Sequence, residues 1–119
     1  MLRELPATKQ VPGEPERRWF FCHEADLVVW FDAAGASTGF QLAYGKYRNE
    51  CSISWHADRG FHHYAVDEGN PLAGHAETPL LHAQGGFEAD RVIALFRALA
   101  EEVPEHIARF VIEKLSSYR

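Results

Sequence analysis

Histidine is the residue type in this chain whose number and spacing most readily suggest chemistry. Of the seven histidines, those in the middle of the chain are His56, His62, His63 and His75. Carboxylates follow two of them at short spacing, in His56-x-Asp58 and His75-x-Glu77. Imidazole and carboxylate together can bind zinc or non-haem iron, and residues two apart on a strand share a face. One interpretation is therefore a small hydrolase or metal-assisted enzyme that uses the His/acid cluster from His56 to Glu77.

The spacing nevertheless argues against a tightly bound metal. His62 and His63 are adjacent, so on a strand they point to opposite faces and at most one can join a site with the others. The two cysteines, Cys22 and Cys51, are too far apart for a zinc-type spacing. A glycine-rich phosphate loop followed by Lys-Ser or Lys-Thr is also missing. We therefore predict no bound metal and no cofactor.

The catalytic candidates of this cluster are His56, Asp58, His63 and His75. Acid–base catalysis without a metal is a second option, because His56 shares a strand face with Glu50, Ser52 and Ser54. A histidine near a serine is the minimum for an activated nucleophile, and Ser54 precedes His56 by two positions. The sequence shows no third group that would orient the imidazole. The balance favours a protein that is not an enzyme, with catalysis left open.

These candidates depend on a sheet that residues 26–56 predict. Residues 26–32 form a nearly continuous apolar run, while residues 37–44 and 50–56 alternate apolar and polar side chains, which predicts three antiparallel strands. Because side chains alternate between the two faces, the apolar faces must meet or they turn to solvent. The register that satisfies this condition pairs Val29 with Phe40, Leu27 with Leu42, Phe40 with Trp55, Leu42 with Ile53 and Tyr44 with Cys51.

The second face of this sheet carries the polar residues of the same strands. In the predicted register Trp30 lies across from Gly39, an arrangement that covers a strand glycine. Gln41, Ser54 and His56 fall on the same face. We predict that Trp30, Gln41, Ser54 and His56 bind a ligand or partner, either a protein or a small molecule.

The fold class follows from the order of the elements. Residues 18–23 predict an edge strand or extended lead-in, and residues 61–66 and 78–82 predict further strands. Helical spacing then places Val92, Phe96, Leu99 and Val103 in one helix, and Ile107, Phe110, Val111 and Leu115 in a second helix that begins near Pro104. The prediction is an α+β fold, in which an antiparallel β-meander of four to six strands is packed by two C-terminal α-helices.

Composition sets the domain organisation and excludes several partners. Residues 1–16 hold Pro6, Pro12 and Pro15 and predict a flexible tail, which leaves residues 17–119 as the single domain. A net charge of −5 without a basic run argues against nucleic acid. No apolar run approaches the roughly 20 residues that span a bilayer, and the N-terminus lacks the apolar region of a signal peptide. We predict a cytoplasmic protein with no membrane partner.

Aromatic residues add an interaction surface. Trp19, Phe20 and Phe21 are consecutive, so a strand cannot bury all three on one face. Tryptophan is enriched at the energetically dominant positions of protein interfaces. We therefore expect a non-enzymatic binding or interaction module, with a homodimer as one form that it takes.

Several of these residues belong to a longer pattern. It runs through Trp19-Phe20, Asp26-Leu27-x-Val29-Trp30, Phe40-Gln41-Leu42-x-Tyr44 and Trp55, and continues in Val66-Asp67-Glu68-Gly69 and Thr78-Pro79. Over about residues 17–115 the pattern resembles a family of small uncharacterised bacterial proteins, hypothetical proteins of the structural-genomics type. The resemblance implies an α+β fold, and it implies neither an activity nor catalytic residues.

Overall fold

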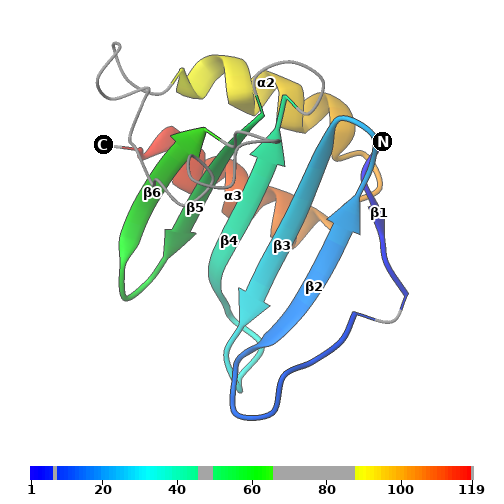
Figure 1. The fold of residues 1–119 in the computed structure, drawn as a ribbon, viewed down its shortest axis with the longest axis vertical. Helices are drawn as coiled ribbons and strands as arrows, with labels where there is room; N and C mark the ends of the chain where they lie inside the picture. Colours follow the sequence, from blue (N-terminus) through cyan, green and yellow to red (C-terminus); the bar gives the residue numbers. More distant parts are fainter. Residues whose placement is uncertain (7, 46–49, 66–87, 119) are drawn as a thin grey trace.

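The computed structural model describes residues 1–6, 8–45, 50–65 and 88–118. Within this part, the strands form a single six-stranded sheet in which each strand is antiparallel to its neighbour in the sequence (Figure 1). The strands are β1 (Arg3–Glu4), β2 (Glu16–Phe21), β3 (Ala25–Phe31), β4 (Ser37–Tyr44), β5 (Cys51–His56) and β6 (Gly60–Ala65). Two helices, α2 (Ala89–Leu99) and α3 (Glu105–Ser116), lie against one face of the sheet. The predicted α+β fold with two C-terminal helices is confirmed.

The register of the central strands follows from the alternation of their side chains. Every pair predicted from the sequence is present, from Val29 opposite Phe40 to Tyr44 opposite Cys51. In β3 the alternation is complete, because every second residue from Ala25 to Phe31 is buried and the residues between them are half-buried. A one-residue slip would turn this whole set to the other face, so burial of one face selects the register.

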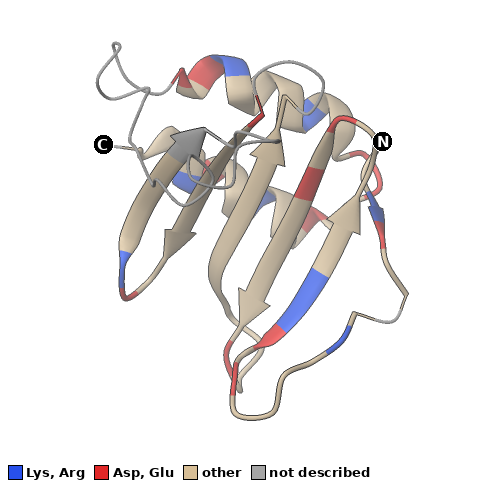
Figure 2. Ribbon diagram, viewed as in Figure 1, with Lys and Arg blue, Asp and Glu red and all other residues tan. Residues whose placement is uncertain are grey.

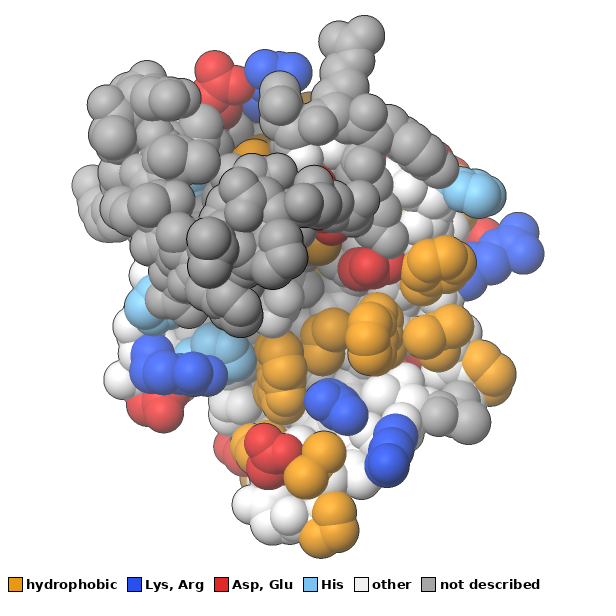
Figure 3. Space-filling model, viewed as in Figure 1, with side chains coloured by type: hydrophobic (Ala, Val, Ile, Leu, Met, Phe, Trp, Pro, Cys, Tyr) orange, Lys and Arg blue, Asp and Glu red, His pale blue; other side chains and the backbone are white. Residues whose placement is uncertain are grey.

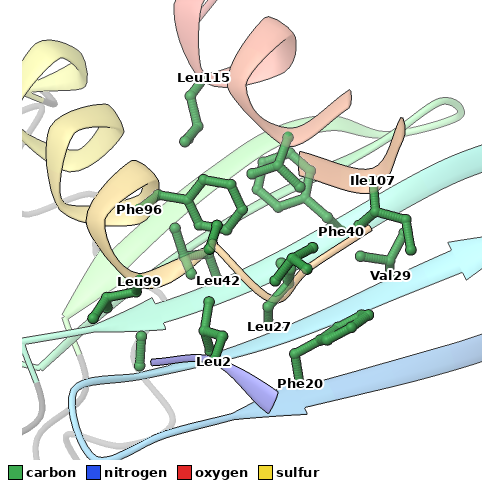
Figure 4. Packing of buried hydrophobic residues seen from close by; sticks show 14 of the residues in the cluster. Leu2, Phe20, Leu27, Val29, Phe40, Leu42, Phe96, Leu99, Ile107 and Leu115 are labelled. Carbon is green, nitrogen blue, oxygen red and sulfur yellow. The ribbon is translucent and has the colours of Figure 1, made fainter. Parts of the chain in front are cut away.

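The core lies between the sheet and the two helices (Figure 4). From the sheet, Phe20, Leu27, Val29, Phe40 and Leu42 point toward the helices, and from the helices Phe96, Leu99, Ile107 and Leu115 point back. Each helix buries a single stripe, which is Val92, Phe96 and Leu99 in α2 and Ile107, Val111 and Leu115 in α3. Full burial of one such side chain stabilises the fold by about 1.5–3 kcal/mol, so the helices dock on this face only.

The first helix ends earlier than its apolar spacing predicts. Val103 continues the helical phase of Val92, Phe96 and Leu99 and is buried, but α2 stops at Leu99 and Val103 lies in the connection to α3. The residue before a proline is disfavoured in helical conformation, and Val103 precedes Pro104. Pro104 then takes the N-cap position of α3, as its place in the sequence predicts.

The start of the chain differs from the flexible tail that its prolines predict. Arg3 and Glu4 form β1, which pairs with β2, and the side chain of Leu2 is 0% exposed. The backbone N–H of Leu2 donates to the carbonyl oxygen of Leu99 at 2.7 Å. The prolines of this segment all follow Leu5, so they leave the first residues able to pair. As a result β2 lies between two strands rather than at the edge.

The predicted strand at residues 78–82 lies outside the described residues. No helix in the part of the chain that the structure describes is long and apolar enough to cross a membrane.

Candidate functional site

We call the face of the sheet opposite α2 and α3 the open face, because neither helix lies on it. Side chains that alternate with the core residues of β2 and β3 make an apolar band on it, formed by Trp19, Phe21, Val28 and Trp30. Leu5, whose N–H donates to the carbonyl oxygen of Trp19, extends the band. Figure 3 shows hydrophobic side chains gathered across this face, with histidines beside them at the left. The band and the histidines belong to one continuous surface.

A hollow of about 810 Å³ lies where the apolar band meets the polar part of the open face. Trp30, Gln41, Ser54 and His56 all line it, so the structure brings together the four residues predicted to bind a ligand. Charged and ionisable side chains from the surrounding loops and from β6 complete it: Glu14, Asp32, Asp58, Arg59 and His62.

The register of the sheet places the four predicted residues side by side. Trp30 is paired with Gly39 and Gly39 with His56, which makes one row across β3, β4 and β5. The neighbouring row on the same face runs from Gln41 to Ser54 and on to His62. Cross-strand neighbours on one face have their Cβ atoms about 4.5–5.5 Å apart, so the two rows form a compact set.

Gly39 provides the space that the His56 ring occupies. A Cβ atom built on Gly39 would overlap Nδ1 of His56 and would lie 2.9 Å from the carbonyl oxygen of Trp55. The His56 ring in turn contacts Trp30, with ring centroids 5.0 Å apart and planes tilted by 53°. The glycine thus lets His56 lie flat over β4 beside Trp30. The predicted pairing of Trp30 with Gly39 is confirmed, and the ring found over the glycine is that of His56.

The polar groups of the hollow are available to a ligand. Burial, followed by Arg59, lowers the pKa of His56 below its usual 6.5, and Asp58 opposes this shift only in part, so the imidazole is neutral at pH 7. Ser54 is 8% exposed. Within the described residues, the side chains of Gln41, Ser54 and His56 make no hydrogen bond. The donors and acceptors of these three side chains therefore remain for a ligand in the hollow.

Of the four residues predicted as catalytic, His56 and Asp58 both line the hollow, and His63 does not. Asp58 is exposed at the rim of the hollow, where its carboxylate lies 3.7 Å from Nε of Arg59. His63 lies on the helix-covered face, paired with Ile53, while His56 lies on the open face. His75 is outside the described residues. Among the residues that the structure describes, no group of three His, Cys, Asp or Glu side chains could hold a metal ion.

His62, rather than the predicted candidate His63, joins His56 on the open face. The turn after β5 pairs His56 with Gly60, which sets Ser54 opposite His62. The sequence contained this signal in Asp58-Arg59-Gly60, where Gly60 takes a positive φ of 74°. Had the length of this turn been known, the register would have placed His62, and not His63, on the same face as His56.

One motif requires the structure for its interpretation. Residues 35–39 match the GxSxG pattern, which in α/β-hydrolases places a nucleophilic serine on a turn from a strand to a helix. Here Gly35 belongs to the turn between two antiparallel strands, and Ser37 pairs with Phe31 at the start of β4. A hairpin does not provide the strand-to-helix turn, so this match is not a nucleophile elbow.

His63 instead belongs to a buried cluster beneath the C-terminal end of α3. The hydroxyl of Tyr44 lies 2.7 Å from Nε2 of His63, and the two rings are nearly parallel. The ring of Tyr118 contacts His63 edge-on at 6.4 Å between centroids. Burial, assisted by Cys51, raises the pKa of Tyr44 well above its usual value, so its hydroxyl keeps its proton. This arrangement is that of a structural hydrogen bond.

Replacement of Tyr44 by phenylalanine tests this structural role. The change leaves Nε2 of the buried His63 without the Tyr44 hydroxyl, so we expect the free energy of unfolding to fall by about 1–2 kcal/mol in urea denaturation. In a His63→Leu background the same change should cost less, because no imidazole is left to satisfy. An equal cost in both backgrounds would show that the hydrogen bond does not stabilise the fold.

Comparison of the chain with models of known protein families, with curated proteins and with solved structures found no match. The resemblance to a family of small bacterial proteins therefore stays a prediction. Any functional conclusion must come from the open face and its hollow.

Proposed function

We propose that this protein is a non-enzymatic binding domain that holds a small ligand in the hollow of its open face. The observation that carries the proposal is the convergence of Trp30, Gln41, Ser54 and His56 on one hollow. Its volume of about 810 Å³ is typical of ligand sites, which range over about 300–1,000 Å³. Such sites combine an aromatic wall with a few polar groups that fix orientation, and Trp30 and the three polar residues supply both.

Binding is favoured over catalysis by the geometry around His56. A catalytic imidazole is oriented by a hydrogen-bonded partner and acts on a nucleophile within reach. In the described residues no hydrogen bond or ion pair joins His56 to Asp58 or to Ser54. Self-association stays a prediction from the sequence. The apolar band shares Trp30 with the lining of the hollow, while Leu5, Trp19, Phe21 and Val28 lie outside that lining.

A fragment screen by NMR tests the proposal. The chain has three tryptophans, so three indole N–H signals report on separate regions. Trp30 lines the hollow, Trp19 lies on the open face outside it, and Trp55 packs against Lys114 on the helix-covered face. We expect bound fragments to shift the Trp30 indole signal and the side-chain amide of Gln41, and to leave the Trp55 signal unchanged.

A matched pair of variants identifies the binding site. Trp30→Phe should weaken the fragments that bind, whereas Trp19→Phe, on the same face, should leave their affinity unchanged. Trp19 is a suitable control because its buried Nε1 has no hydrogen-bond partner among the described residues, so phenylalanine removes no bond within them. Fragments that shift Trp19 or Trp55 instead of Trp30, or a library without any binder, would refute the proposal.

A further inference from the structure

The hollow is lined by more acidic than basic side chains. Glu14, Asp32 and Asp58 face it, against Arg59 alone among the lysines and arginines of its lining. Arg59 lies 3.7 Å from Asp58, which leaves Glu14 and Asp32 uncompensated. Figure 2 marks acidic positions in red on the ribbon at the lower end of the sheet, where β2 begins and β3 ends. Since His56 is neutral at pH 7, the hollow carries a negative charge there.

The two uncompensated carboxylates have acceptor capacity to spare. Oδ1 of Asp32 accepts the N–H groups of Ala34 and Ala36, each at 2.9 Å, which leaves Oδ2. The Glu14 side chain makes no hydrogen bond or ion pair to the described residues. Another basic residue of the same face, Arg17 opposite Trp30, does not line the hollow, and its Nε donates to the carbonyl oxygen of Lys9 at 2.9 Å.

Trp30 and Ser54 each set a further requirement on the chemistry of a ligand that fits the hollow. Trp30 is the largest aromatic side chain of the lining, and a tryptophan ring attracts a cation placed over its face. Ser54 is more than nine-tenths buried, lines the hollow, and has a hydroxyl without a hydrogen-bond partner in the described part of the chain. A fitting ligand therefore presents positive charge toward Trp30 and the carboxylates, and a polar group toward Ser54.

We infer that the ligand of the hollow is a small organic cation, an ammonium or guanidinium compound that also carries a hydroxyl or carbonyl group. This inference rests on the proposed binding function and specifies its ligand class. Negative charge at Glu14 and Asp32 disfavours anions such as phosphates and carboxylates. A bare metal ion is disfavoured too, because the described residues hold no set of three ligands for it.

Choline and its neutral carbon isostere, in which carbon replaces the quaternary nitrogen, are the probes that test this inference. They have nearly the same shape and the same hydroxyl, so a difference in affinity reports the charge. 2-Guanidinoethanol, which carries a guanidinium and a hydroxyl, tests the guanidinium form of the same class. In NMR titrations of the full chain we expect choline or 2-guanidinoethanol to shift the Trp30 indole signal, with choline binding at least about threefold more tightly than its isostere.

Charge-removing variants locate the cation. Asp32→Asn keeps the side-chain oxygen that the Ala34 and Ala36 N–H groups use, so it removes charge while the turn is retained. Combined with Glu14→Gln, it should weaken the cationic probe by about three- to tenfold and leave the isostere unchanged. Glu105→Gln removes one carboxylate at an exposed position of α3, outside the hollow, and should change neither.

The outcomes separate the ligand class from the binding function. Equal affinity for choline and its isostere overturns the cation inference, and so does failure of both cations up to about 50 mM, where ligands of millimolar Kd are detected. In either case library fragments that shift the Trp30 signal still support the binding function. If the library fragments fail as well, both conclusions fail.

Discussion

Replacement of Leu2 by alanine is expected to lower the free energy of unfolding by about 2–5 kcal/mol, the usual cost of a large-to-small change in a core. Leu2 is 0% exposed and belongs to the same cluster as Phe20, Leu27 and Phe96. Its backbone N–H also bonds to the carbonyl oxygen of Leu99, which ties β1 to the end of α2. A residue at the second position of the chain should thus behave as a core residue.

Leu5 is the matched control for this prediction. It is the same residue type in the same segment but is 40% exposed, so Leu5→Ala should change stability by no more than about 0.5 kcal/mol. Urea denaturation followed by circular dichroism measures both variants. If β1 separates locally before the rest unfolds, the measured cost of Leu2→Ala falls, and hydrogen exchange of the Leu2 amide would detect that opening. Equal, small effects of the two changes would restore the flexible tail that the prolines predict.

The contrast between the tail and the sheet shows which parts of the fold a sequence of this kind can predict. The register of β3, β4 and β5 is encoded locally, because alternation with a period of two leaves one pairing that buries every apolar side chain. The stripes of α2 and α3 are encoded in the same way. Docking of Leu2 depends on a single apolar residue and on a contact with Leu99, and no periodic pattern signals a contact of that kind.

The candidate site divides along the same line. Alternation alone placed Trp30, Gln41, Ser54 and His56 on one face, and the structure brings all four to one hollow. The rim residues come from loops, whose course has no periodicity, so the lining by Glu14 was not predicted. The register between β5 and β6 depends on the length of the turn that joins them, which the sequence does not show directly. For this reason His63 was predicted as a site residue in place of His62.

Replacement of Gly39 by alanine should lower the free energy of unfolding by about 1–3 kcal/mol, the usual cost of overpacking. General propensity predicts the opposite sign, because glycine inside a strand is less stable than alanine by about 0.5–1 kcal/mol. The structure reverses this expectation, since a Cβ atom would overlap the His56 ring and approach the Trp55 carbonyl oxygen to 2.9 Å. The sign of the measured change therefore decides whether Gly39 is needed for space.

Measuring Gly39→Ala in a second protein background separates the contact of the new methyl group with His56 from its contact with the Trp55 carbonyl oxygen. In a His56→Ala protein the ring is gone, so Gly39→Ala should cost less, and what remains reports the approach to the rigid backbone at Trp55. Ala43→Gly, on the same strand and face, is the control for propensity alone and should cost about 0.5–1 kcal/mol. Equal costs of Gly39→Ala in both backgrounds would place the whole conflict at the backbone. A cost that vanishes without the imidazole would mean that Gly39 is there to hold His56 beside Trp30, because only that ring then requires the space.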